Sequence, residues 1–177
     1  MISYAPLFAN EHDRLWNPDA IMFNSKVAYG ISSYWVQTFF KQSSGAKLLK
    51  VQFLNHSLPE HTYATAISWT SKEDKKDHIT IKVVNFNNVT FSSKISFDGV
   101  DANSIKAWRK TVLTCDDLEA DNTFDNPTKV VPISSLIESE VGEDGIDLVV
   151  QPYSFTAFDL ITNAQHSSNS SKSNNTP

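Results

Sequence analysis

Three acidic side chains close to the start of the chain are the first candidates for chemistry. Glu11, Asp13 and Asp19 lie in one polar stretch that follows the apolar run Ser3–Ala9. Paired carboxylates serve as general acid and base only when rigid elements hold both of them at a fixed separation. A loop on its own does not hold such a pair, so the sequence predicts no catalytic residue in this stretch.

Metal and cofactor chemistry has little support in the sequence. The five histidines are scattered, and His56 and His61 flank Glu60 in a stretch typical of a solvated hairpin loop. Cys115 is the only cysteine, which excludes an intrachain disulfide and a cysteine-based zinc site. The chain has five glycines and no glycine-rich phosphate loop. We therefore predict no metal site and no cofactor.

The length and the charge balance limit the classes of protein that remain. A chain of 177 residues predicts one domain, with room for part of a second. The 15 basic and 20 acidic residues, a net charge of −5, form no clustered basic footprint for nucleic acid. No apolar run approaches the roughly 20 residues that span a bilayer. The first residues also lack the basic and apolar regions of a signal peptide.

Four asparagines match the acceptor pattern for N-glycosylation. They are Asn55, Asn88, Asn169 and Asn174. The pattern is short and arises by chance in a chain rich in Asn and Ser. It matters only for a protein that enters the secretory pathway, and for such a protein these four are the candidate glycosylation sites.

The first 45 residues predict a strand, a long loop and a helix. Ser3–Ala9 is typical of a short buried strand, and the polar stretch Asn10–Gly30 predicts an extended loop. Ser32 or Ser33 can cap the helix that follows, and Gly45 supplies its end. One face of this helix is apolar and carries Trp35, Val36, Phe39 and Phe40.

From Ala46 onward the hydrophobic pattern has a period of two, which predicts an antiparallel, jelly-roll-like β-sandwich of about seven or eight strands. Tyr63 and Trp69 share a strand face with Ile67, so we expect both in the core. Asp116–Glu143 predicts a long loop with short extended pieces. The strand candidates are KLLKVQFL, TYATAISWT, HITIKVVNF, TFSSKISF, Ala107–Cys115, Ile146–Val150 and Ser154–Ile161.

The chain therefore divides into unlike parts. We predict a βα unit in residues 1–45, the sandwich in 46–162 and a disordered Ser/Asn-rich tail in 163–177. In a barrel of βα units, the loop after each strand lies on the catalytic face. We interpret residues 1–45 as the last unit of such a barrel whose other units are absent from this chain. The helix would then expose an apolar face that needs a partner.

Several multi-residue segments make the sequence recognisable. These are SYAPLF, WNPDAIMFNS, YGISSYWVQ, KVVNF, FDNPTKVVP and PYSFTAFDL, in this order. They resemble the C-terminal portion of α-L-arabinofuranosidases of glycoside hydrolase family 51, especially the plant members. The resemblance runs from about Ser3 to Leu160, nearly the whole chain.

The resemblance implies a (β/α)8 barrel followed by a β-sandwich that packs against it. It implies release of terminal α-L-arabinofuranosyl residues from arabinoxylan, arabinan and arabinogalactan with retention, which uses two carboxylates about 5 Å apart. In the family both are glutamates at the ends of the fourth and seventh barrel strands, which would lie upstream of Met1. Catalysis therefore needs a barrel in cis or in trans, and we expect this chain alone to be inactive.

Three residues of the N-terminal loop are candidate substrate contacts in a complete enzyme. Trp16 has a ring that could stack on a sugar, and Asn10 and Asn17 have amides that could bind hydroxyls. The alternative is that Trp16 and Pro18 pack against barrel helices while Asn17 forms a turn with Pro18.

Two non-catalytic functions also stay open, namely carbohydrate binding by exposed aromatic residues and stabilisation of a barrel. For carbohydrate binding the candidate aromatics are Tyr63, Trp69, Trp108 and Tyr153. The family resemblance favours an extracellular or cell-wall location, although this N-terminus encodes no export signal.

Overall fold

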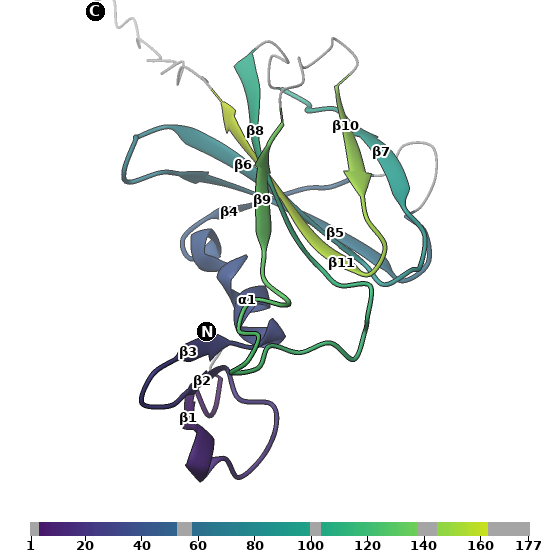
Figure 1. The fold of residues 1–177 in the computed structure, drawn as a ribbon. Coiled ribbons are helices and arrows are strands. Elements are labelled where there is room, and N and C mark those ends of the chain that lie inside the picture. The colour runs from purple at the N-terminus through teal and green to yellow at the C-terminus, as the bar shows by residue number, and fades with distance from the viewer. Residues whose placement is uncertain (1–3, 53–57, 100–103, 138–144, 163–177) are drawn as a thin grey trace, which may run out of the picture.

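Two β-sheets lie face to face and form the larger part of the molecule, and a small third sheet lies at one end (Figure 1). The computed structural model describes residues 4–52, 58–99, 104–137 and 145–162, apart from the side chains of 106–108. One layer of the sandwich has six antiparallel strands in the order β4-β5-β6-β11-β8-β9, and the other pairs β10 with β7. The predicted mainly-β antiparallel sandwich is confirmed.

Most of the sandwich strands fall where the alternating pattern predicted them. The strands are β4 (Lys47–Leu49), β5 (Thr62–Thr70), β6 (Asp77–Asn85), β7 (Phe91–Ile95), β8 (Ile105–Thr114), β9 (Ile133–Leu136), β10 (Ile146–Val150) and β11 (Ser154–Thr162). β9 is one of the short extended pieces expected within Asp116–Glu143. Residues 163–177, predicted to be a disordered tail, lie outside the described residues.

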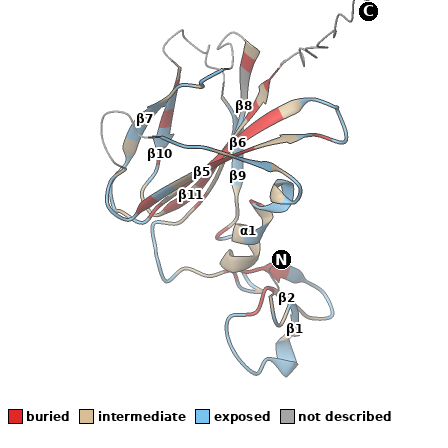
Figure 2. Cartoon of the chain, turned by 180° about the vertical axis from the view of Figure 1, so that it is seen from behind, coloured by how far each residue is buried: buried red, intermediate tan, exposed pale blue. Residues whose placement is uncertain are grey.

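The space between the two layers holds the main hydrophobic core. β6 contributes Ile79, Ile81 and Val83, and β11 contributes Phe158 and Leu160. All five are at most 6% exposed, and buried positions are concentrated along the strands of the larger sheet (Figure 2). Burying such a side chain contributes about 1.5–3 kcal/mol, so these strands account for much of the stability of the fold.

Strand β5 turns its large side chains away from this core, contrary to our prediction. Ala64 and Ala66 face the core, because their register partners on β6 are the core residues Val83 and Ile81. Tyr63, predicted to be in the core, is 62% exposed on the opposite face. Trp69 on that same face is half-buried. The alternation on β5 was read correctly, but small side chains occupy its core face, so side-chain size was a misleading guide.

Helix α1 (Ser32–Thr38) packs on the outer face of the six-stranded sheet. Phe39, directly after the helix, is 7% exposed and packs against Phe155 of β11, with the two rings tilted and their centroids 4.5 Å apart. The prediction of an exposed apolar helix face is therefore wrong for Phe39, because the outer face of β11 and β8 is itself apolar here. The partly buried residues around this cluster are Trp35, Val36, Cys115, Ala120 and Phe155.

The N-terminal segment contains a three-stranded sheet where the sequence predicted one strand and a loop. β1 (Phe8–Asn10) pairs in parallel with β2 (Ile21–Phe23), which pairs antiparallel with β3 (Ala28–Gly30). The first strand thus starts later than in the predicted run Ser3–Ala9. The predicted loop contains β2, β3 and the short helical turn η1 (Glu11–Asp13). Strands of three residues are too short to produce a periodic pattern.

The helix also begins differently from the prediction. Ile31 occupies the N-cap position, and no side chain caps the helix. The hydroxyl of Ser33 instead hydrogen-bonds the Tyr4 hydroxyl at 2.7 Å. This bond ties the first described residue of the chain to the first turn of the helix. Gly45, predicted to end the helix, follows the short turn η2 (Lys41–Ser43) and has a φ of 78°.

Asn122 joins the long loop after β8 to the N-terminal sheet. Its side chain is 1% exposed, and its amide nitrogen donates to the carbonyls of Gly30 at 2.8 Å and Val130 at 2.9 Å. Its amide oxygen accepts from the backbone N–H of Val130 at 2.7 Å. Residues on the two sides of the predicted domain boundary at residue 45 are therefore in contact. The division of the chain at that residue stays a prediction.

Replacing this amide tests the connection. Asn122→Ala leaves three buried backbone groups without their partner and should lower the free energy of unfolding by about 2–4 kcal/mol. Urea unfolding measures the change, and Asn126→Ala, an exposed asparagine of the same loop, is the matched control with an expected change below about 0.5 kcal/mol. Equal stabilities of the two variants would contradict this role of Asn122.

Candidate functional site

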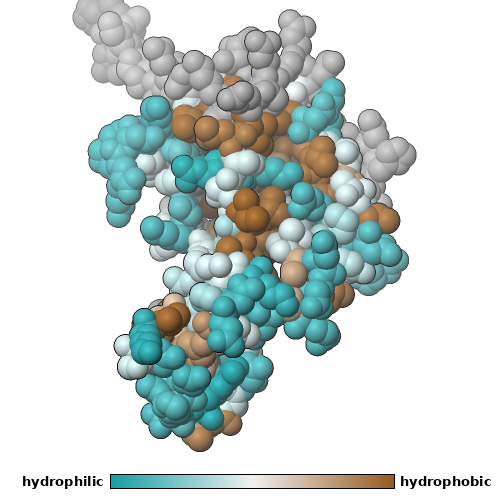
Figure 3. Space-filling view, in the orientation of Figure 1, coloured by the Kyte–Doolittle hydropathy of each residue, from teal (hydrophilic) through white to brown (hydrophobic). Residues whose placement is uncertain are grey.

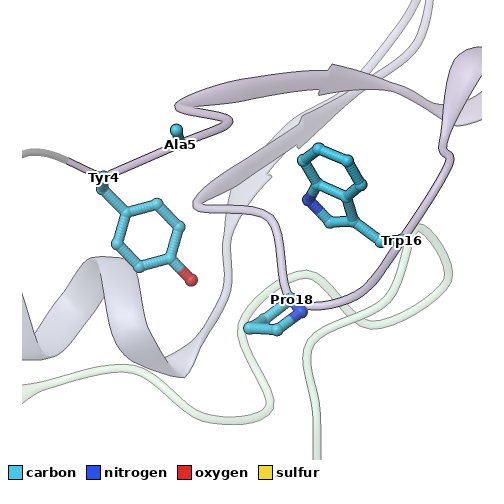
Figure 4. Close-up of a pocket in the computed structure, with 4 residues that line it drawn as sticks. All are labelled: Tyr4, Ala5, Trp16 and Pro18. Carbon is cyan, nitrogen blue, oxygen red and sulfur yellow. The ribbon is translucent and has the colours of Figure 1, made fainter.

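An open hollow lies beside the N-terminal sheet, and aromatic rings form much of its wall (Figure 4). Tyr4, Ala5, Trp16 and Pro18 line it, with a volume of about 490 Å³. Trp16 is 59% exposed, so its indole presents free surface to a ligand or to a partner. An exposed ring beside a hollow can stack on the apolar face of a sugar or pack against another protein domain.

The loop that carries Trp16 is folded around the side chain of Arg14. The Arg14 Nε donates to the Asp19 carboxylate at 3.0 Å and to the backbone carbonyl of Trp16 at 3.2 Å. An Nη of the same guanidinium donates to the side-chain oxygen of Asn17. Asp19 is 1% exposed, and a buried carboxylate is tolerated only with a charged or hydrogen-bonding partner. Arg14 and Asp19 therefore fix where Trp16 lies.

Of the three predicted contact residues, the structure brings only Trp16 to the hollow. The side chain of Asn10 accepts from the backbone N–H of His12 at 3.0 Å and caps η1. The side-chain oxygen of Asn17 is taken by Arg14. Both amide oxygens thus have local structural partners. Tyr4, which was not among the predicted contact residues, lines the hollow instead.

The three acids of this region have separate surroundings. Glu11 accepts from the Asn24 side chain at 3.0 Å, Asp13 belongs to the exposed turn η1, and Asp19 is paired with Arg14. Among the described residues, none of the acids lines the hollow. The described residues also contain no group of three or more His, Cys, Asp or Glu side chains that could hold a metal ion.

Burial shifts the pKa of two groups close to these elements. Tyr29 of β3 packs edge-on against Phe124, and burial raises the pKa of its phenol, with Arg14 acting in the opposite direction. Lys82 of β6 lies beneath η2, and burial lowers the pKa of its ammonium group. Its Nζ donates to the Ser43 hydroxyl at 2.6 Å and lies 4.4 Å from the Phe40 ring centroid.

The N-terminal sheet also exposes apolar side chains away from this hollow. A second open hollow of about 530 Å³ lies along Phe8, Phe23 and Val27. Phe8 is 61% exposed, and its ring meets the edge of Phe23 at a centroid distance of 6.4 Å. In the view of Figure 3, this end of the molecule is mostly hydrophilic with smaller hydrophobic areas, while larger hydrophobic areas lie over the sandwich.

The structure describes one of the four candidate glycosylation sites and one of the two histidines that flank Glu60. Asn88 is exposed in the turn between β6 and β7. His61 is exposed and lies 3.5 Å from Glu60, as expected for a solvated loop. The candidates Asn55, Asn169 and Asn174, and also His56, lie outside the described residues. Within the part of the chain that the structure describes, no helix is long and apolar enough to cross a membrane.

Comparison with known proteins agrees with the fold. Residues 1–154 match the family model of the alpha-L-arabinofuranosidase C-terminal domain. The chain is 46% identical over 163 residues to alpha-L-arabinofuranosidase 1 of Arabidopsis thaliana, and 44% identical over 169 residues to alpha-L-arabinofuranosidase 2 of that plant. The alignments cover 91% and 94% of this chain but 23% and 24% of the relatives, so the chain spans about a quarter of their length.

Solved structures give the same assignment at the level of the fold. An arabinose-bound GH51 α-L-arabinofuranosidase, MgGH51, superposes with a TM-score of 0.67 at 22% identity, over 91% of this chain and 24% of that chain. The architecture is that of a β-sandwich domain from a glycoside hydrolase. The chain belongs to the family of α-L-arabinofuranosidase C-terminal domains, in glycoside hydrolase family 51. The resemblance inferred from the sequence segments is confirmed.

Proposed function

We propose that this domain serves an α-L-arabinofuranosidase that removes terminal arabinofuranosyl residues from arabinoxylan, arabinan and arabinogalactan with retention of configuration. The family membership of residues 1–154 carries the proposal. Retaining hydrolysis needs two carboxylates about 5 Å apart, one as nucleophile and one as acid and base. Glu11, Asp13 and Asp19 are not brought together at the hollow, so a catalytic barrel would supply both carboxylates.

The N-terminal sheet is the surface that supports contact with such a barrel. β1 and β2 are parallel, and parallel strands are ordinarily covered on both faces. β1 is an edge strand of its sheet, and Leu7 and Phe8 beside that edge are 48% and 61% exposed. An exposed apolar edge strand of this kind can pair with a further strand. The barrel would cover this edge in cis or in trans.

The purified chain alone should not hydrolyse an aryl α-L-arabinofuranoside, because retaining hydrolysis needs two carboxylates about 5 Å apart and the acids of the described N-terminal segment are not brought together at the hollow. The measurement is the rate at which the aryl group is released, compared with the rate in buffer alone. The variants Glu11→Gln and Asp13→Asn test whether the exposed acids contribute. Turnover by the wild-type chain that disappears in either variant would show a catalyst within this domain and overturn the proposal.

Trp16 is the residue best placed to touch substrate from this domain, and its exposure also favours the alternative of carbohydrate binding without catalysis. Trp16→Ala should weaken binding to arabinoxylan about three- to tenfold, since an aromatic contact contributes about 0.5–1.5 kcal/mol. Affinity electrophoresis measures the effect. The neighbouring Leu15, 90% exposed, supplies the control Leu15→Ala. A wild-type chain that arabinoxylan does not retard excludes binding by this domain alone.

We also propose an extracellular or cell-wall location, as the family resemblance favours. Asn88 is then the described asparagine that would carry a glycan, because it is exposed in a turn. When the chain is expressed with an export signal in a plant secretory system, peptide N-glycosidase should increase its electrophoretic mobility. For Asn88→Gln the increase in mobility should be smaller because one glycan is missing. It should still be present because the other three acceptors remain. If Asn88→Gln shows the same increase in mobility as the wild-type chain, Asn88 is not an acceptor.

A further inference from the structure

Two exposed aromatic rings lie against each other where β5 begins and β6 ends. Tyr63 of β5 and Phe86, directly after β6, are each 62% exposed. Their rings meet edge to face, with centroids 6.3 Å apart and an interplanar angle of 76°. The backbone N–H of Phe86 donates to the His61 carbonyl at 3.1 Å, which holds the two segments together. One exposed apolar side chain is ordinary, but a pair of exposed rings is a surface that can receive a partner.

An acceptor for N-glycosylation lies in the same turn as one of these rings. Asn88 and Thr90 belong to the acceptor pattern Asn-Val-Thr, and both residues are exposed. Asn88 follows Phe86 by two residues, and two residues of chain span at most about 7 Å. A sugar attached to the side-chain nitrogen of Asn88 therefore begins close to the aromatic pair.

A buried asparagine holds the backbone on both sides of Asn88. Asn85 is 1% exposed, and its side-chain nitrogen donates to the carbonyls of Val89 and Gln151, both at 2.9 Å. Its side-chain oxygen accepts from the backbone N–H of Asn87 at 3.0 Å. The residues before and after Asn88 are thus bonded to one buried side chain, so the turn presents Asn88 from a defined backbone.

The neighbouring Asn87 fastens this turn to the strand that carries Tyr63. Its side-chain nitrogen donates to the Glu60 carbonyl at 2.7 Å and to the Thr62 hydroxyl oxygen at 3.1 Å. Its carbonyl accepts from the backbone N–H of Tyr153 at 3.0 Å. These bonds fix the turn relative to the start of β5, and therefore relative to both rings of the pair.

We propose that the Tyr63–Phe86 pair binds the first N-acetylglucosamine of a glycan on Asn88, an inference that rests on the proposed extracellular or cell-wall location. A pyranose ring has an apolar face of C–H groups that packs on an aromatic ring. This face of the sugar would cover Phe86, and Tyr63 would support Phe86 from β5. Tyr63, a candidate for polysaccharide binding, would then contact the chain's own glycan.

A comparison of four proteins tests the contact. The full chain is secreted with Asn55, Asn169 and Asn174 replaced by Gln, so that Asn88 is the single acceptor. An endoglycosidase trims the glycan to one sugar, and mass spectrometry measures its attachment. Urea unfolding then compares this protein with its Asn88→Gln variant, and the same two proteins are made with Phe86→Ala.

With Phe86 in place, loss of the sugar should lower the ratio of folded to unfolded protein at a fixed urea concentration about three- to tenfold. In the Phe86→Ala background, the same loss should change the ratio by less than about twofold. Leu136→Ala removes an exposed apolar side chain of β9. In that background the full effect of the sugar should remain.

Nuclear Overhauser contacts between the Phe86 ring and the sugar are measured on the protein that keeps Phe86, so this readout does not depend on a substitution at the ring. They should be present. A secreted chain without a glycan on Asn88 overturns both this inference and the assignment of Asn88 as an acceptor. An attached sugar without these contacts, or with an equal effect in the Phe86→Ala background, overturns this inference alone.

Discussion

The packing of α1 and Phe39 on the outer face of the six-stranded sheet is the contact on which the rest of the arrangement depends. Phe39 and Phe155 bury apolar surface between residues 116 positions apart in the chain. Because β3 leads directly into α1, seating the helix also places the N-terminal sheet relative to the sandwich. The loop after β8 then closes over both, with Asn122 bonded to Gly30. One apolar contact thus determines which polar groups can meet.

Much of the sandwich could be predicted because its strands are long enough to show an alternating pattern of hydrophobic and polar residues. β6 shows the clearest case, with Ile79, Ile81 and Val83 toward the core as expected. The face of β5 was assigned wrongly because the core there accepts alanines, and a sequence does not show how much space the opposite sheet leaves. The site of α1 was missed for a related reason. Its apolar face was evident, but its cover comes from outward residues of β8 and β11, whose direction depends on the sheet.

The hollow beside Trp16 shows why a site is harder to predict than a strand. Trp16 was a candidate from its residue type alone. Tyr4 reaches the same hollow because the Pro6 and Leu7 carbonyls accept the backbone N–H groups of Ala20 and Ile21, at 3.3 and 2.9 Å. Arg14 organises the loop largely through a backbone carbonyl and a buried carboxylate. Contacts between backbone groups and distant side chains leave no periodic pattern in a sequence.

Polar side chains on the outer face of β6 give the apolar contact between the Phe39 segment and the sheet a definite position. His78, Thr80 and Lys82 point outward and are all buried, although a solvated sheet face would leave them exposed. Hydrophobic contact has little directionality, and Phe39 alone would tolerate small sliding of the helix. Lys82 adds a directed contact, since its Nζ donates to the hydroxyl of Ser43 in η2, the turn that follows the helix. Burial lowers the pKa of Lys82, which shows that this definite position costs free energy of solvation.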